Sequence, residues 1–393
     1  MTRYDPYNHE KKWKDWKLKV KSKIPDISKT NSKVILQYLD DMEVGINIAK
    51  GTVKGGRSYV RLNTLKERMI FFARKFEQLY RINDITTVTE SQILKFFNDM
   101  ARGYIKREDG REYKSIETYA KIYRAFFHWW IKYNEKKGIN VTNIVEDVDV
   151  KSKDPEWTYL DESQVNQLYT ESNDYYKTLI MFLYDSGMRA PSELMNIKVQ
   201  DLIEKGDILY LDIREEIAKK GSHGRKIRLM LCKEIIKKHI RDNHLSENDF
   251  LFTKSPATMN KYLKRLGKRV LGDKKSLAGK KYSELTMYDY RHCSCCYWVN
   301  RYPKERKLMY RFGWKKSDKI YYYSKFLGME DDITDEDLLV DMTKAQLEKD
   351  VVKLQKENEF LNNRLKRVEE QMIKMQHLSS TILEKAYALE VDK

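Results

Sequence analysis

The feature that most constrains this chain is a long heptad pattern near its C-terminus. Between residues 347 and 382, apolar side chains recur at alternating steps of four and three positions, with Asn358 and Ser379 as polar exceptions. A 3.5-residue period is typical of a helix that pairs in a coiled coil. Asn358 falls at an a position, where a buried amide favours a parallel two-stranded register. The pattern predicts a C-terminal coiled coil over 342–390, and a lone amphipathic helix packed on its own domain is the alternative.

The charge balance favours a polyanionic partner. The chain of 393 residues has 76 Lys and Arg against 59 Asp and Glu, a formal net charge of +17 that is spread over its whole length. A globular protein with such an excess repels itself, and binding to nucleic acid is the usual reason for it. A lysine-rich proteome, in which the charge only maintains solubility, is the alternative.

Several classes of protein are disfavoured. No stretch reaches the ~18–20 uninterrupted apolar residues of a membrane span, and the charged N-terminus has no apolar core of a signal peptide. We therefore expect a cytoplasmic protein without membrane contacts. The run Cys293-Ser294-Cys295-Cys296 suits neither a disulfide framework nor the paired spacing of a zinc site. We expect buried, reduced cysteines, no metal and no cofactor.

Periodicity divides the rest of the chain into two domains. A basic N-terminal segment, 1–30, precedes amphipathic patterns that predict a small helical bundle over 31–150. VDVKSKDPEW, with alternating charge and a proline, reads as the linker. Beyond it, ILYLDIREE and RKIRLMLC predict strands on either side of a KKGSHG hairpin loop, among further helices. Residues 155–335 are therefore predicted to be an α+β domain, mainly α with a small antiparallel β-sheet.

Four separated motifs of this second domain carry residues suited to phosphoryl chemistry. They are YDSGMRAPSEL after a glycine turn, KKG at the hairpin tip, LTMYDYRHCSCCYW on a helix and FGWKKSDKIYYYSKFLG. Each motif alone is ordinary structural sequence, and only the order and spacing are specific. In chain order the candidate site residues are Arg189, Lys220, Tyr288, Arg291, Trp314 and Tyr323.

This ordered set resembles the tyrosine recombinase family of phage-type integrases, and the flanking residues look closest to archaeal integrases. SGMRAPSEL is similar to the family's first arginine box, KKG to its lysine hairpin, YDYRH to its second box, and FGW with the later tyrosine to its last box. The resemblance covers residues 158–330. It implies site-specific cleavage and rejoining of DNA, as in a mobile genetic element, through a 3′-phosphotyrosine. It also implies that 31–150 is a helical DNA-binding domain.

The resemblance assigns each candidate a role. Tyr323 is the nucleophile, and Tyr321 and Tyr322 are less favoured because only Tyr323 has the family's distance from Trp314. Two arginines, Arg189 and Arg291, stabilise the charge of the transition state, since guanidiniums donate bidentately to phosphate oxygens without a metal.

The leaving 5′-oxygen needs a proton, and a lysine on the hairpin can supply it. Lys220 fits that place best, with Lys219 and Lys226 in reserve. Trp314 is expected to donate its indole N–H to a phosphate oxygen.

Three departures from the family pattern are visible. Tyr288 stands where the family has a histidine, and a phenol, with a reference pKa of ~10, is a poorer base. Glu193 lies four residues after Arg189 instead of three, where it can still brace the site. The predicted coiled coil replaces or extends the family's short C-terminal helix.

The expected partners are double-stranded DNA and further copies of the chain. We expect a dimer through the coiled coil and a tetramer on paired DNA sites. A non-catalytic, dimeric DNA-binding protein of the same fold and a type IB topoisomerase are the alternatives. Candidates for phosphate contacts are Arg57, Arg61, Lys66, Lys254, Lys261 and Lys264, and for each of them a solvated helix face is the alternative.

Overall fold

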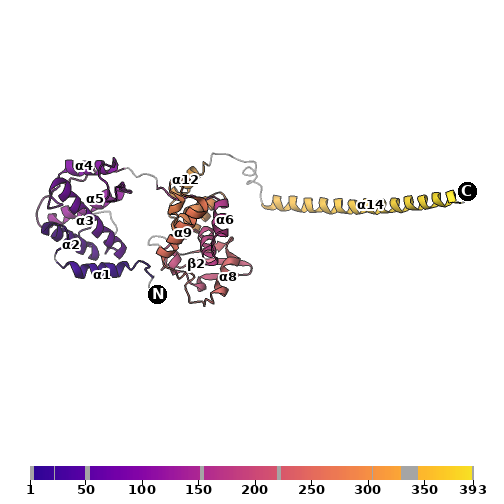
Figure 1. Ribbon diagram of the computed structural model, residues 1–393, viewed down its shortest axis with the longest axis horizontal. Helices are drawn as coiled ribbons and strands as arrows, with labels where there is room; N and C mark the ends of the chain where they lie inside the picture. Colours follow the sequence, from indigo (N-terminus) through magenta and orange to yellow (C-terminus); the bar gives the residue numbers. More distant parts are fainter. Residues whose placement is uncertain are drawn as a thin grey trace. The chain divides into compact units, whose positions relative to one another are not determined.

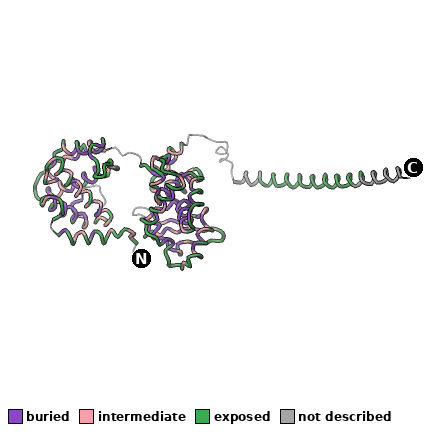
Figure 2. The backbone as a smooth tube through the Cα atoms, viewed as in Figure 1, coloured by how far each residue is buried: buried purple, intermediate pink, exposed green. Residues whose placement is uncertain are grey.

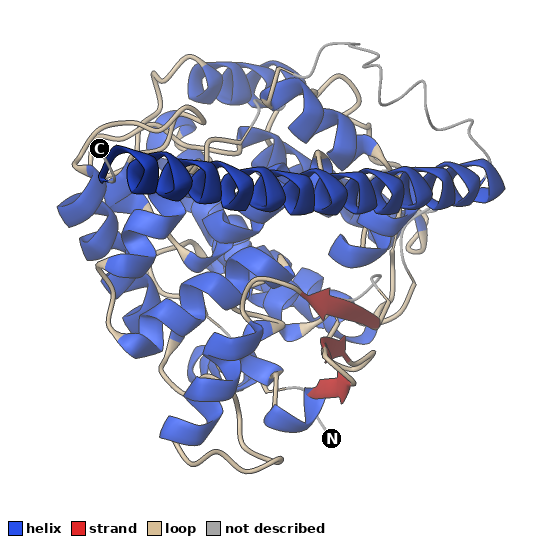
Figure 3. Ribbon diagram, turned by 90° about the vertical axis from the view of Figure 1, so that its right-hand side faces the viewer, coloured by secondary structure: helices blue, strands red, loops and turns tan. Residues whose placement is uncertain are grey.

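The computed structural model describes residues 4–21, 23–48, 54–150, 155–218, 223–302, 304–328 and 344–391. It divides into two compact units, Met1–Tyr323 and Ser324–Lys393. Helices dominate both units, and a small three-stranded sheet lies among the helices of the first (Figure 3). Within the described residues, no helix combines the length and the apolar character needed to cross a membrane.

The first part of the chain is a helical bundle around an aromatic core (Figure 1). The rings of Phe72, Phe76, Phe96 and Tyr123 pack edge to face at its centre. Trp13 belongs to the same core, so the basic N-terminal segment contributes a helix to the bundle. The helices are α1 (His9–Val20), α2 (Lys29–Val44), α3 (Tyr59–Tyr80), α4 (Glu90–Ala101) and α5 (Ile116–Glu135).

The remainder of the first unit has the predicted mainly helical composition with a small antiparallel sheet. Its strands are ordered β1-β2-β3 and are antiparallel throughout. Sequence patterns predicted two of the strands; the third, β1, is a four-residue strand paired with β2. The elements are α6 (Glu162–Thr170), α7 (Asp174–Ser186), β1 (Leu202–Lys205), β2 (Ile208–Ile213), β3 (Arg225–Leu229), α8 (Lys233–Asp242), α9 (Pro256–Leu271), α10 (Met287–Val299), α11 (Glu305–Phe312) and α12 (Asp318–Phe326).

A buried helix, α7, organises this region by packing against α6, α8 and α10. It ends at Gly187, whose φ of 58° lies in the left-handed region that favours glycine. A Cβ at Gly187 would also lie 2.2 Å from the ring of Phe312 and 2.7 Å from Oγ of Ser294. The sharp turn at this glycine delivers the following loop, with Arg189, to the space between α10 and α11.

The second unit contains one uninterrupted helix, α14 (Lys344–Val391), of 48 residues. At 1.5 Å per residue it is ~72 Å long. Apolar residues at the predicted coiled-coil positions, including Val351, Leu354, Leu361 and Leu365, are exposed along its described length (Figure 2). The sequence prediction of a helix here is confirmed, while pairing of two such helices stays a prediction.

Candidate active site

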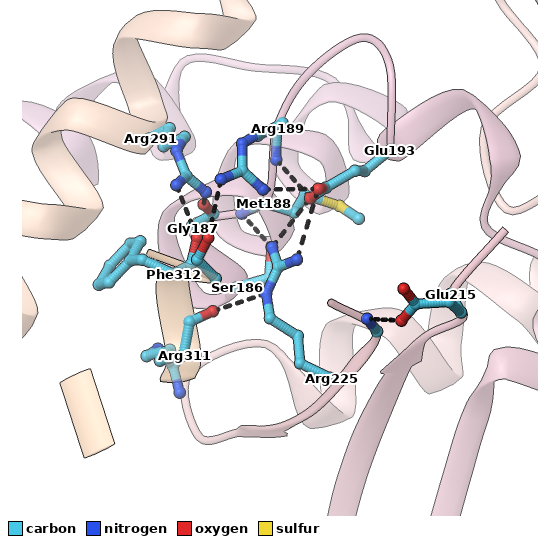
Figure 4. A network of polar contacts seen from close by, with 12 residues as sticks. Ser186, Gly187, Met188, Arg189, Glu193, Glu215, Arg225, Arg291, Arg311 and Phe312 are labelled. Carbon is cyan, nitrogen blue, oxygen red and sulfur yellow. Dashed lines mark hydrogen bonds and ion pairs between the residues drawn. The ribbon is translucent and has the colours of Figure 1, made fainter. Parts of the chain in front are cut away.

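Arg291 is held by backbone carbonyls from two elements. It lies in the second turn of α10, which begins with a capping box between Thr286 and Asp289. Its guanidinium donates to the carbonyl of Gly187 at 2.5 Å and to that of Phe312 at 2.8 Å (Figure 4). Burial lowers its pKa from the ordinary value. The side chain is therefore locked in place by the ends of α7 and α11.

Arg189 is anchored beside Arg291 by a carboxylate. Its backbone N–H and its Nη1 donate to the two oxygens of Glu193 at 3.0 and 2.9 Å, and its Nη2 donates to the carbonyl of Gly313 at 3.1 Å (Figure 4). This direct contact supports the predicted role of Glu193 in bracing the site. Two guanidiniums from distant motifs converge at the turn that follows α11.

A third arginine, which sequence reasoning did not single out, completes this network. Arg225, at the start of β3, donates from Nη2 to Glu193 at 2.9 Å and from Nε to the carbonyl of Arg311 at 2.9 Å. Burial alone would raise the pKa of Glu193, but Arg225 and Arg189 hold it at about 2. Glu193 is therefore ionised at neutral pH although it has no exposed surface. The only sequence signal was the alternation of β3, which places Arg225 on its buried face.

Tyr323 lies on α12 in an aromatic pocket. Its side chain is only 5% exposed, and its ring stacks on Trp314 with centroids 6.0 Å apart and planes within 15°. Trp314 in turn stacks on Phe312, whose carbonyl holds Arg291. Burial raises the pKa of the Tyr323 phenol well above its usual value, so the hydroxyl is protonated at neutral pH.

His292 and Trp157 form the other wall of this pocket, and neither was predicted as a site residue. Nδ1 of His292 lies 2.7 Å from the Tyr323 hydroxyl, and the imidazole stacks on Trp157 with centroids 4.8 Å apart. Burial lowers the pKa of His292 to about 4, so the ring is neutral at neutral pH. The position after the second-box arginine was the one sequence signal for His292.

The other tyrosines of the site differ in environment from Tyr323. Tyr288 is 48% exposed and contacts the edge of the His292 ring, with centroids 5.2 Å apart. Tyr322 accepts a hydrogen bond from Trp157 Nε1 at 2.9 Å, and Tyr321 is 70% exposed. Of the three consecutive tyrosines, Tyr323 is the one whose hydroxyl contacts His292.

The lysine hairpin is only partly described. Lys219 and Lys220 lie outside the described residues, between the ends of β2 and β3. The reserve residue Lys226 is described: its Nζ lies 3.6 Å from Asp212 across the sheet, and its side chain is half exposed. The structure thus brings together Arg189, Arg291, Trp314 and Tyr323, with Tyr288 at the rim.

Comparison with known proteins identifies the protein family to which this arrangement of residues belongs. Residues 158–326 match the phage integrase family. This segment is a phage integrase family domain. The matched range begins just before α6 and ends with α12, so it contains both arginines, the hairpin and Tyr323. Among curated proteins, no sequence match is found.

Solved structures share the fold of this chain at low identity. A lambda integrase dimer bound to a core site is 15% identical with a TM-score of 0.54, over 77% of this chain and 79% of that one. XerH recombinase bound to difH is 14% identical with a TM-score of 0.54, over 75% and 94%. The Tn1549 transposon integrase in complex with transposon end DNA is 18% identical with a TM-score of 0.52, over 79% and 98%.

Proposed function

We propose that Tyr323 attacks a DNA phosphodiester and becomes joined to the 3′-phosphate, and that this step drives site-specific recombination. The phage integrase family domain makes the chain a tyrosine recombinase, an enzyme that breaks and rejoins DNA strands. The observation that carries the proposal is the convergence of three groups. Arg291 and Arg189 donate to the carbonyls of the adjacent residues Phe312 and Gly313, and the next residue, Trp314, stacks on Tyr323.

The arginines supply the positive charge that the reaction needs. Arg189 and Arg291 each present a guanidinium that can donate to the non-bridging oxygens of the attacked phosphate. Because Glu193 and backbone carbonyls already fix them, little reorganisation accompanies the development of charge. As the Tyr323–phosphorus bond forms, the bond to the 5′-oxygen breaks, and Lys220 protonates that oxygen. A 5′-hydroxyl reverses the step.

The N-terminal bundle offers a surface for the DNA backbone. A pocket between its helices is lined by Arg57, Arg61, Lys121 and Arg124, beside the aromatic ring of Trp129. The first two are among the expected phosphate contacts, and the second two lie on α5. We expect this pocket to hold a phosphate of the duplex, which positions the DNA without reading its sequence.

Assembly is proposed to use α14. Its exposed apolar stripe and the Asn358 position support a parallel dimer, and recombination on paired sites then requires a tetramer. We also propose an origin in an archaeal mobile genetic element, from the resemblance of the sequence boxes to archaeal integrases.

The decisive experiment traps the covalent intermediate on DNA of randomised sequence. The probe is a pool of duplex DNA with random flanks around one phosphate whose bridging 5′-oxygen is replaced by sulfur. A sulfur leaving group needs no proton and rejoins poorly, so adducts accumulate. We compare the wild type with Tyr323→Phe and with the matched control Tyr321→Phe, whose hydroxyl is exposed.

We expect an SDS-stable adduct with the wild type and with Tyr321→Phe, and none with Tyr323→Phe. Sequencing the trapped DNA then identifies the target site. DNA binding without an adduct in any of the proteins contradicts the proposal and favours the non-catalytic binding protein. Relaxation of plasmids that lack the selected site favours a topoisomerase.

A further inference from the structure

The proposed reaction requires a group that removes the proton from Tyr323. The position at which the family has a histidine is occupied by Tyr288, which contacts the imidazole of His292 and is half exposed. A described group in direct hydrogen-bond distance of the nucleophilic oxygen is His292, with Nδ1 2.7 Å from the Tyr323 hydroxyl. This distance is that of a direct hydrogen bond and needs no bridging water.

We propose that His292 is the general base of the reaction and accepts the Tyr323 proton on Nδ1 as the tyrosine attacks phosphorus. The proposal rests on the function given above and assigns the proton transfer to a residue outside the predicted set. His292 touches the reacting atom, so its role is catalytic and is distinct from that of the arginines.

The surroundings fix the ring in the orientation that this transfer needs. Trp157 covers one face of the imidazole with planes within 22° of parallel, and Tyr288 meets the ring edge-on at 76°. Trp157 also packs edge-on against Tyr323 and donates to Tyr322. An imidazole clamped in this way cannot rotate away from the phenol, which is the geometric requirement for a base.

The thiol of Cys295, which also interacts with the Tyr323 hydroxyl, does not fit the role of base. Burial raises the pKa of Cys295 to about 12, so the thiol keeps its proton. It interacts with the Tyr323 hydroxyl, where a protonated sulfur can donate but cannot remove a proton.

The balance of charges around His292 sets when the proton moves. Asp289 favours the imidazolium, whereas burial disfavours it. Three positive groups also disfavour the imidazolium: Arg291 on the same helix, Lys280 in the preceding loop and Lys319 on α12. Tyr323 therefore keeps its proton in the free protein. Formation of the oxygen–phosphorus bond makes the phenolic proton acidic, and it then passes to Nδ1. In the reverse step the imidazolium returns it to the departing Tyr323 oxygen.

The sulfur-bridged DNA isolates this proton transfer, because its leaving group needs no acid and the reaction no longer depends on Lys220. His292→Asn keeps a hydrogen-bonding atom near the position of Nδ1 but cannot act as a base. We expect it to slow adduct formation by about 10²–10⁴-fold. The matched control is His244→Asn, an exposed loop histidine with a left-handed φ of 49° that asparagine tolerates.

A second variant distinguishes chemistry from folding. His292→Ala removes the imidazole and leaves a space against Trp157, and added free imidazole is expected to restore adduct formation at least tenfold. Because only neutral imidazole can accept a proton, the restored rate of His292→Ala is expected to increase with pH. The wild-type rate is expected not to change when imidazole is added over the same pH range. Thermal melting and retention of DNA on a gel confirm that each variant is folded.

The outcomes separate this proposal from the function on which it rests. If the wild type forms the Tyr323-dependent adduct and His292→Asn matches its rate, or imidazole fails to restore His292→Ala, His292 is not the base and the recombinase assignment stands. If no adduct forms with the wild type, both proposals are wrong.

Discussion

The N-terminal bundle and the phage integrase domain bury different chemistry. Among its described residues, the bundle buries mainly aromatic and aliphatic side chains, and Asp41 is its one buried charged group. Asp41 accepts hydrogen bonds from Trp129 and Asn47 at 2.8 and 2.6 Å. The integrase domain buries a series of charged side chains, including Asp185, Glu193, Arg225, Asp289, Arg291 and Arg311.

Stability alone does not explain the second pattern. Removing charges from water is costly, and well-packed apolar residues of similar volume often serve a fold as well as a buried ion pair does. The bundle avoids most of this desolvation cost, because aromatic rings pack on one another in its core. In the proposed mechanism, the buried charges of the integrase domain fix the arginines in position before a phosphate arrives. The comparison therefore predicts that substitutions in the bundle affect mainly stability, whereas substitutions of these arginines affect mainly the reaction.

The largest change in stability is expected in the bundle. Phe72 has no exposed surface and packs on six other aromatic rings of the bundle. Phe72→Ala is expected to lower the free energy of unfolding by about 3–5 kcal/mol, because it leaves a cavity that the neighbours only partly fill. Urea unfolding measures this loss. A loss below about 1 kcal/mol would mean that the core is not the tightly packed cluster described.

Arg291→Lys tests whether a buried charge of the integrase domain serves the reaction. Lysine keeps the charge but cannot span the carbonyls of Gly187 and Phe312 and also donate bidentately to phosphate. We expect adduct formation to fall by about 10²–10³-fold, the range for loss of one preorganised donor. The rate is measured on sulfur-bridged DNA alongside the melting temperature. A large fall in the melting temperature with an unchanged rate per folded molecule would place Arg291 among the folding residues.

Glu193→Gln tests how a buried charge of the integrase domain contributes to stability, through the pH dependence of unfolding. The pKa of Glu193 lies at about 2 in the folded protein against an ordinary 4.5, and at 1.36 kcal/mol per pKa unit this is about 3 kcal/mol. A depressed carboxyl pKa stabilises the fold fully above pH 4.5, and the contribution is lost as pH falls towards 2. The stability gap between wild type and Glu193→Gln should therefore narrow below pH 4.5. A gap that stays constant would exclude the ionic role of Glu193.

The smallest effect is expected at the rim. Tyr288 is half exposed and touches His292 through its ring, so Tyr288→Phe preserves the contact and removes only the hydroxyl. We expect the adduct rate to fall less than about tenfold, at the low end for loss of a single neutral hydrogen bond. If Tyr288→Phe is slower than His292→Asn, the base is Tyr288, and the roles proposed for the two residues exchange.

The fold class could be predicted from the sequence because local sequence patterns indicate it. Helical periods, the change of period at the sheet and the 3.5-residue repeat each depend on neighbours along the chain. The mainly helical composition with a small antiparallel sheet is confirmed, and so is the long C-terminal helix. The four-residue strand β1 was missed because LIEK is too short to show alternation.

Sequence reasoning reached less of the site, because much of it depends on tertiary contacts. Arg225 begins a predicted strand and was not singled out, because only folding opposes it to Glu193, 32 residues earlier. Trp157 falls in what reads as a linker, yet its ring contacts His292 and Tyr322, which are distant in the sequence. His292 was visible in the second box, but its contact with Tyr323 follows from the placement of α12, which no local pattern encodes.

The burial of Tyr323 also has a consequence for the host chromosome. A protomer that searches for its target slides past an enormous excess of unrelated phosphodiesters. An exposed, ionised nucleophile would be ready to nick any of them. Here the phenol packs against Trp314 and Trp157, and burial raises its pKa. In the proposed mechanism it loses its proton only when a phosphate is seated, and we expect this to suppress damage to DNA that the protein only visits.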